Sequence, residues 1–66
     1  MIQLHFRATD DMDGWTEECD TVEEAVSTFQ YYMGKTYDIG SSYCVNAWGD
    51  VTCTLEGATW ETLGIR

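Results

Sequence analysis

The side chains able to do chemistry in this chain are mostly carboxylates, and eight of the twelve lie within fifteen consecutive residues. They are Asp10, Asp11, Asp13, Glu17, Glu18, Asp20, Glu23 and Glu24. No Lys or Arg interrupts this run. Charges that serve solubility alone are better scattered and mixed in sign, because clustered like charges repel one another and destabilise the fold. The run therefore predicts a surface that attracts a positively charged partner.

Groups suited to catalysis are sparse. His5 is the single histidine and is expected on the face of a sheet, while Cys19 is surrounded in the sequence by acids that disfavour its thiolate. The chain contains no glycine-rich phosphate loop, nucleophile elbow or metal-dependent His motif. We therefore expect no catalytic residues, and a protein that is not an enzyme.

A metal site is suggested only by the segment before Trp15. With Gly14 at position 6 of an EF-hand loop, Asp11 and Asp13 fall at the ligand positions 3 and 5. Thr9 would then occupy position 1, and the preceding segment has the pattern of a strand instead of the required helix. A zinc site would need C-x-x-C pairs, which are absent. Neither a metal nor another cofactor is expected, and calcium binding remains a secondary alternative.

Length and composition indicate one small acidic domain over residues 1–66. The chain is 44% hydrophobic and has three Trp, four Tyr and two Phe, more than a disordered acidic tail carries. Its formal net charge of −9 repels nucleic acids and anionic membranes and steers the protein toward basic surfaces. The expected partner is therefore a basic protein, with no direct contact to nucleic acid or membrane.

The cysteines favour a reducing compartment. Their number is odd, at three, and no signal segment, membrane-spanning stretch or lipidation motif is recognisable. Free thiols in the cytoplasm fit this pattern best.

Two elements are predicted to flank the acidic run. Residues 2–9 alternate between apolar and polar side chains, which is typical of a half-buried strand. Segment 10–20 breaks that pattern and reads as a loop, in which Trp15 either anchors a partner or folds back over the core. A helix is expected to follow, with a capping box of Thr21 and Glu24 and a stop at Gly34. Its apolar stripe comprises Val22, Ala25, Val26, Phe29 and Met33.

The rest of the chain is expected to add strands. A connection over 37–42 leads into a hairpin with strands 43–48 and 51–55, and segment 59–65 is either a short edge strand or an irregular tail. The predicted fold is α+β, with the order β-α-β-β, a possible short fourth strand, and one helix packed on an antiparallel sheet.

The hairpin register decides which residues face the two central cysteines. If the turn consists of residues 49–50, Cys44 pairs with Leu55. If the loop spans 47–50, Cys44 lies opposite Cys53 and a disulfide becomes geometrically conceivable. The cytoplasmic compartment favours reduced thiols in either register.

In size, charge and the acidic run from Asp10 to Glu24, the chain is similar to small phage-encoded inhibitors of host defence, the anti-CRISPR and anti-restriction DNA mimics. This resemblance implies a short single-domain protein in the cytoplasm of a host bacterial cell. The sequence leaves the oligomeric state open, with a monomer favoured. The resemblance also implies stoichiometric inhibition, in which the carboxylates and Trp15 occupy a basic DNA-binding surface, for example on a CRISPR surveillance subunit. The concentration of acids in one segment favours a compact basic pocket over a long duplex channel.

A second function is compatible with the same sequence. A free strand edge and surface aromatics would make the chain a small interaction or assembly module, with its acids serving only solubility. The aromatic candidates are Tyr31, Tyr32, Tyr43 and Trp60. High salt separates the two alternatives, because it weakens charge-driven binding and spares hydrophobic docking.

Overall fold

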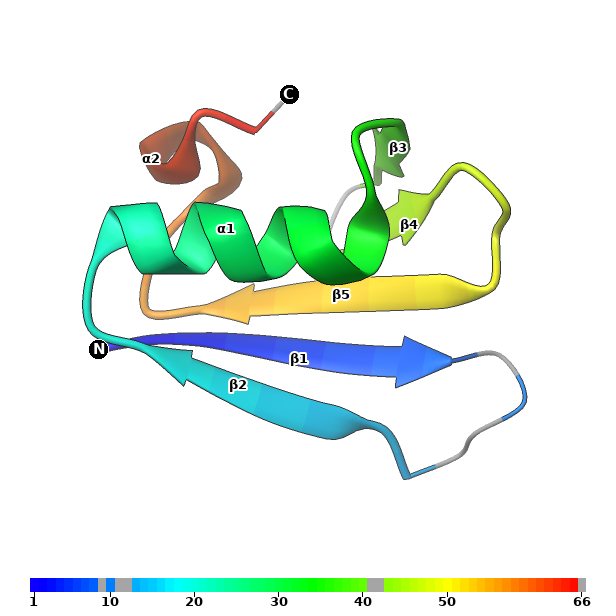
Figure 1. Cartoon of the computed structure of the whole chain (residues 1–66), viewed down its shortest axis with the longest axis horizontal. Coiled ribbons are helices and arrows are strands. Elements are labelled where there is room, and N and C mark those ends of the chain that lie inside the picture. The colour runs from blue at the N-terminus through cyan, green and yellow to red at the C-terminus, as the bar shows by residue number, and fades with distance from the viewer. Residues whose placement is uncertain (9, 11–12, 41–42, 66) are drawn as a thin grey trace.

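The computed structural model describes residues 1–8, 10, 13–40 and 43–65, which build a five-stranded sheet with a long helix on one face (Figure 1). Along the chain the elements are β1 (Ile2–Ala8), β2 (Trp15–Cys19), α1 (Val22–Met33), β3 (Tyr37–Ile39), β4 (Cys44–Asn46), β5 (Val51–Glu56) and α2 (Trp60–Leu63). The strand order is β2-β1-β5-β4-β3, and every neighbouring pair is antiparallel. The α+β class and the helix on an antiparallel sheet are confirmed, while the number of strands is larger than predicted.

Strand β1 follows the alternation of its sequence. Ile2, Leu4 and Phe6 are buried, whereas Arg7, which directly follows Phe6, is exposed. Because successive side chains point to opposite faces of a sheet, the buried set faces α1 and the polar set faces solvent. β1 pairs with β2 on one side and with β5 on the other, so it lies inside the sheet.

Helix α1 begins and ends where the sequence predicts. The Thr21 side chain accepts a hydrogen bond from the Glu24 N–H (3.1 Å), and the Glu24 carboxylate accepts one from the Asp20 N–H (2.8 Å). The capping box is therefore present, with its carboxylate one residue further back than expected. Gly34 ends the helix at φ 79°, a conformation that favours glycine. Ala25, Phe29 and Met33 form the buried side of α1.

Two segments predicted as connections are strands. Residues 15–19 of the expected loop 10–20 form β2, and residues 37–39 of the expected connection 37–42 form β3. In β2 the sequence does not show the alternation of apolar and polar residues, because one of the positions that face α1 is Glu17, a residue type that is uncommon in strands. Pairing with β1 overrides that local preference. Tertiary pairing thus supplies what the local sequence does not indicate.

The β4–β5 hairpin uses the longer of the two predicted loops. Cys44 lies opposite Cys53, so the register based on a turn at residues 49–50 is wrong. Asn46 explains the choice, because its buried amide oxygen accepts hydrogen bonds from the N–H groups of Asp50 (3.0 Å) and Val51 (3.3 Å). Both cysteines are free. Burial raises the pKa of Cys53 to about 12, and burial with a smaller contribution from Asp38 raises that of Cys44 to about 11.

The C-terminal segment 59–65 is neither an edge strand nor an irregular tail. It forms the short helix α2, whose first turn is capped by the Thr59 hydroxyl accepting from the Thr62 N–H (3.1 Å). Leu63 and Ile65 are buried, and Trp60 packs against Phe29 of α1 with 5.7 Å between ring centroids. α2 therefore covers the end of the core beside α1 (Figure 1).

Candidate partner-binding edge

The acidic run is laid out along β2, one of the two edges of the sheet (Figure 1). Glu17 and Glu18 lie within this strand, Asp13 shortly before it and Asp20 directly after it. Asp10, at the turn after β1, is exposed, as are Asp13, Glu18 and Asp20. Asp11 lies outside the described residues. An extended strand therefore spreads carboxylates that the sequence suggested were gathered in a compact loop.

The run continues into the first turn of α1. Glu23 and Glu24 are both exposed there, beside the positive end of the helix dipole. Since the chain has no Lys or Arg between Arg7 and Lys35, no cation in that interval neutralises these acids. The sheet edge and the start of the helix form one acidic border.

Glu17 differs from its neighbours because its side chain points to the helix side of the sheet. It lies opposite the buried Leu4, and it accepts a hydrogen bond from the Tyr32 hydroxyl of α1 (3.0 Å). That hydrogen bond is the main cause that raises the pKa of Tyr32 above its ordinary value, since a tyrosinate would face the carboxylate. Glu17 is thus held in place as a hydrogen-bond acceptor at the edge.

Trp15 folds back over the core, which confirms one of its two predicted placements and argues against the exposed anchor. It is half-buried, and its ring lies 5.5 Å from that of Phe6 and 5.3 Å from that of Tyr32. These contacts fasten the beginning of β2 to β1 and α1. Trp15 therefore supports the acidic border with its ring packed against the core.

The outward backbone groups of β2 can be assigned from its neighbours. The Thr52 hydroxyl donates to the Arg7 carbonyl (3.2 Å), so that carbonyl is directed toward β5. Carbonyls of successive strand residues alternate in direction, which turns the Phe6 carbonyl toward β2; a β-carbon at Gly14 would indeed collide with it. In this register Trp15, opposite Phe6, pairs its backbone with β1. The N–H groups of Thr16 and Glu18 consequently point away from the sheet.

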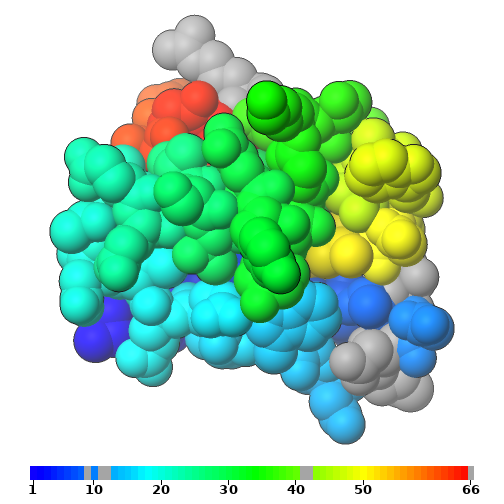
Figure 2. All heavy atoms as spheres, in the orientation of Figure 1, coloured from blue at the N-terminus to red at the C-terminus, as the bar shows by residue number. Residues whose placement is uncertain are grey.

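A shallow groove runs between this edge and α1. It has a volume of about 260 Å³ and is lined by Glu17, Ser27, Thr28, Tyr31 and Tyr32. Figure 2 shows α1 in green and cyan directly above the light-blue β2 on this side of the molecule. Tyr31 is 81% exposed, which is unusual for a large aromatic side chain, and its ring stands nearly perpendicular to that of Tyr32.

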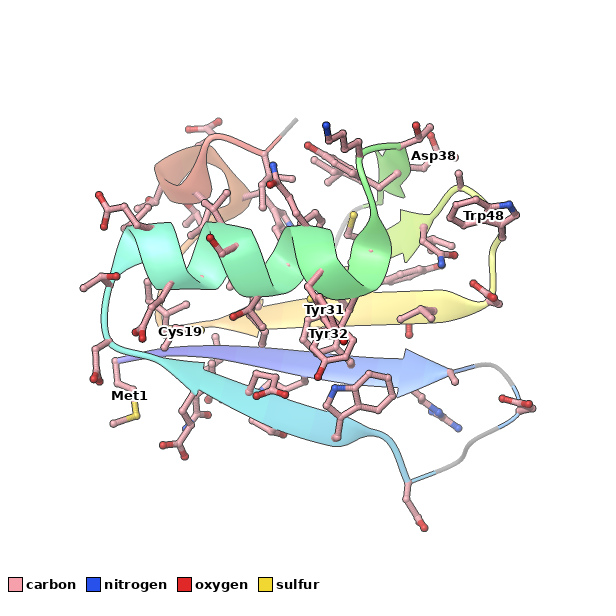
Figure 3. The ribbon with its side chains drawn as sticks, viewed as in Figure 1. Met1, Cys19, Tyr31, Tyr32, Asp38 and Trp48 are labelled. Carbon is pink, nitrogen blue, oxygen red and sulfur yellow. The ribbon has the colours of Figure 1, made fainter. Side chains whose placement is uncertain are left out.

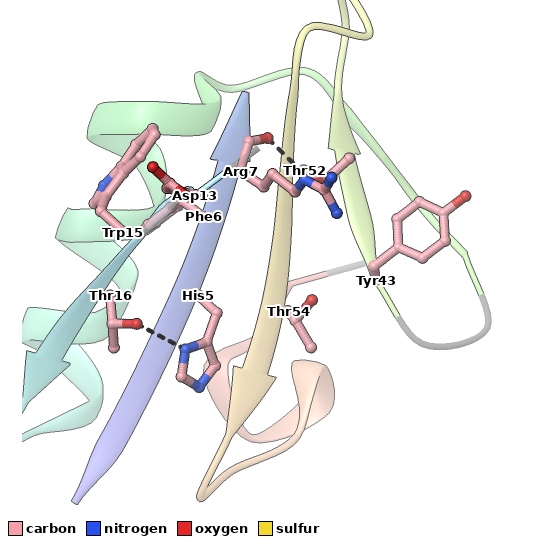
Figure 4. A pocket seen from close by; sticks show the side chains of 10 residues that line it. His5, Phe6, Arg7, Asp13, Trp15, Thr16, Tyr43, Thr52 and Thr54 are labelled. Carbon is pink, nitrogen blue, oxygen red and sulfur yellow. Dashed lines mark hydrogen bonds between the residues drawn. The ribbon is translucent and has the colours of Figure 1, made fainter. Parts of the chain in front are cut away.

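The opposite face of the sheet carries a polar hollow of about 700 Å³ (Figure 4). Its walls include the side chains of His5, Arg7, Thr16, Tyr43 and Thr54. The alternation of residues 2–9 correctly predicted that His5 and Arg7 share one face of the sheet. It did not predict that residues of β2, of β5 and just before β4 would line a hollow around them.

Within this hollow His5 connects three strands. Its Nε2 lies 2.9 Å from the Glu56 carboxylate of β5, and its Nδ1 lies 2.9 Å from the Thr16 hydroxyl of β2. A carboxylate only accepts, so Nε2 carries a proton, and in the neutral ring Nδ1 accepts from Thr16. The order hydroxyl, imidazole, carboxylate is the one used in nucleophilic catalysis. On this exposed sheet face its evident structural effect is to tie β2 and β5 to β1.

Three features of this part of the molecule were not predicted from the sequence. These are the partners of His5, the turn-forming role of the buried Asn46, and Trp48, which is 79% exposed at the β4–β5 turn. Only Asn46 had a usable signal, because Asn side chains at turns commonly bond to nearby backbone. The His5 partners depend on long-range pairing, with Glu56 more than fifty residues away along the chain.

The described part of the chain includes no group of three or more His, Cys, Asp or Glu placed to hold a metal ion. Asp11 and Thr9 of the calcium alternative lie outside the described residues. None of the described helices is long and apolar enough to cross a membrane.

Comparison with known proteins gives no relative. The chain matches no family model, no curated protein and no solved structure.

Proposed function

We propose that this chain is a stoichiometric inhibitor that binds the basic DNA-binding surface of a nucleic-acid-binding complex, in the manner of anti-CRISPR DNA mimics. The acidic border of β2 and α1 supplies the carboxylates, and the chain acts as a monomer without catalysis in the cytoplasm of a host bacterial cell. The observation that carries the proposal is the extension of the acidic run along a sheet edge, uninterrupted by cations.

An extended acidic strand can meet a basic surface from both of its faces. Because successive side chains of a strand point to opposite faces, Glu17 and Glu18 reach different sides of the β2 edge, and Asp20 follows directly after the strand. Arg and Lys side chains that hold phosphates would meet these carboxylates on either side of the edge. The exposed acids of the first turn of α1 extend the same pattern beyond the strand.

A pair of double variants tests the proposal. Glu18→Gln with Asp20→Asn removes two charges from the acidic border, and Asp38→Asn with Glu61→Gln removes two charges elsewhere; all four residues are exposed. Immobilised protein is incubated with bacterial lysate, washed, and eluted with duplex DNA or high salt. We expect the wild type and the second variant to retain a DNA-binding complex that DNA releases, and the first variant to retain about tenfold less.

Two results would contradict the proposal. Equal losses in both variants would mean that net charge, and not the acidic border, determines binding. Retention only of partners that resist both salt and DNA would favour the assembly module instead. Trp48 gives that second function specific support, since an aromatic ring this exposed is a candidate docking residue. In that case Trp48→Ala, and not the charge variants, should abolish retention.

A further inference from the structure

The edge of β2 offers hydrogen-bonding backbone as well as charge. β2 is five residues long, and among the described strands it pairs with β1 alone. The N–H groups of Thr16 and Glu18 point outward, and the chain contains no proline to block the edge. An edge of this kind can accept another strand.

The side chains of the edge restrict which strand it can accept. Glu17 points to the α1 side and Glu18 to the open face, so an added strand meets a carboxylate on each face. Residues directly opposite one another on paired strands lie about 4.5–5.5 Å apart, where unlike charges stabilise and like charges destabilise. A second copy of β2 would place acids against acids. An extended segment rich in Lys or Arg would satisfy both faces.

The groove beside α1 adds a place for one basic side chain. The Tyr32 hydroxyl fixes the Glu17 carboxylate there, and the exposed ring of Tyr31 stands beside it. Figure 3 shows both tyrosines below α1 on the side of β1 and β2. A Lys or Arg could lay its aliphatic stem or its cation on the Tyr31 ring while its charge meets Glu17. This accounts for the exposure of Tyr31, which the core does not explain.

We propose that the partner contributes an extended basic segment that binds β2 as a sixth strand, with one Lys or Arg seated between Glu17 and Tyr31. The inference rests on the proposed function, because it takes a basic partner as given and specifies how that partner is held. It predicts backbone hydrogen bonds that simple charge attraction does not require.

Amide hydrogen exchange on the wild-type protein tests the backbone bonds directly. The probe is a peptide of about ten residues that repeats the unit Lys-Lys-Thr-Thr, which places lysines on both faces of an added strand. Saturating peptide should slow exchange at Thr16 and Glu18 by about tenfold or more, and leave the exposed edge of β3 unchanged. A peptide of the same sequence with alternate amides methylated should bind about tenfold more weakly. No binding of the parent peptide, or binding without protection at Thr16 and Glu18, would overturn the inference.

Two variants at Thr16 separate the contribution of its outward backbone N–H to binding from the contribution of charge. Thr16→Pro and Thr16→Ala both lose the hydroxyl that contacts His5 and keep the net charge, but only proline removes the outward N–H. We expect the alanine variant to bind the peptide like the wild type and the proline variant about tenfold more weakly. Equal binding by two folded variants would refute strand addition. If the proline variant does not fold, the exchange experiment alone decides.

The groove is tested by Tyr31→Ala, with Tyr43→Ala as a control at the other exposed tyrosine. The first change should weaken peptide binding by about two- to fivefold and the second should not alter it. If both variants change peptide binding equally, the groove beside α1 does not hold a basic side chain of the partner.

Different results would refute strand addition and the proposed function. If Thr16→Pro still retains a DNA-binding complex as well as Thr16→Ala, the acidic border binds without strand addition. If the wild type itself retains no DNA-releasable complex, the proposed function fails.

Discussion

The two edges of the sheet are protected in different ways. β2 has five residues and carries acids on both faces, whereas β3 has three residues and one acid, Asp38. β3 lies next to an apolar groove of about 450 Å³ that is lined by Ile39, Thr59, Trp60, Glu61 and Ile65. A short strand offers little backbone for pairing, so it needs no charge to avoid association. The comparison indicates that the length of β2 is tolerated because its charge rejects a second copy.

The largest expected effect is on the free energy of unfolding, and it compares a glycine just before β2 with a glycine just after β3. Gly14 has φ 67°, and a β-carbon there would collide with the Phe6 carbonyl, so Gly14→Ala should cost on the order of 3 kcal/mol of unfolding free energy. Gly40, near β3, has no such φ, and a β-carbon would lie 3.2 Å from the Tyr43 carbonyl oxygen. Gly40→Ala should cost less than about 1 kcal/mol. Urea titration measures both, and equal costs would contradict the assigned approach of β2 to β1.

Alkaline pH should lower the stability of the protein through the buried thiols of Cys44 in β4 and Cys53 in β5. The pKa values of Cys44 and Cys53 are raised from 9.0 to about 11 and about 12, mainly by burial. The unfolded chain therefore loses these protons first, so their contribution is complete below pH 9 and is lost as pH rises through the folded values. We expect unfolding free energy to fall between about pH 9 and about pH 12.

The informative quantity is a difference between two proteins, because it isolates the contribution of one thiol. Cys53→Val should show a shallower decline than the wild type in urea titrations at several pH values. A parallel decline would mean that Cys53 does not contribute to the pH dependence.

Salt should act mainly on the β2 side. Screening weakens repulsion within the acidic border, so added sodium chloride should raise the melting temperature by a few degrees, equivalent to roughly 1 kcal/mol. The rise should shrink in Glu18→Gln with Asp20→Asn, and persist in Asp38→Asn with Glu61→Gln. If the second variant lost the rise as well, repulsion would be a property of the whole surface.

The smallest expected effect concerns His5, which joins the β2 edge to β5. His5→Gln removes at least one of two exposed hydrogen bonds and should cost roughly 0.5–1 kcal/mol in urea titration. A nitrophenyl ester assay on the same variant tests the absence of catalysis. We expect equal background hydrolysis from the wild type and His5→Gln, and a faster wild type would assign a catalytic role to the Thr16–His5–Glu56 chain.

Local patterns predicted the elements whose own residues define them. The alternation after Ile2 predicted a strand over 2–9, and β1 covers Ile2–Ala8, with residue 9 outside the described residues. The predicted cap at Thr21 and stop at Gly34 give α1 its correct limits. β2 and β3 escaped prediction because their stability comes from pairing with neighbouring strands, and their own sequences carry acids or are only three residues long. The composition of the acidic border was readable from the sequence. Its shape was not, since that depends on whether residues 15–19 coil or extend.

The pairing of β1 with β5 has a consequence for how the protein is made. Gln3 is paired with Glu56, so the middle of the sheet joins residues near opposite ends of the chain. At roughly 5–20 residues per second of synthesis, β1 waits about 3–10 s for its second partner to emerge from the ribosome. The β1–β2 hairpin and α1 involve only nearby residues and can form during that interval. The acidic border is therefore expected to assemble early in biosynthesis, while the sheet that supports it closes last.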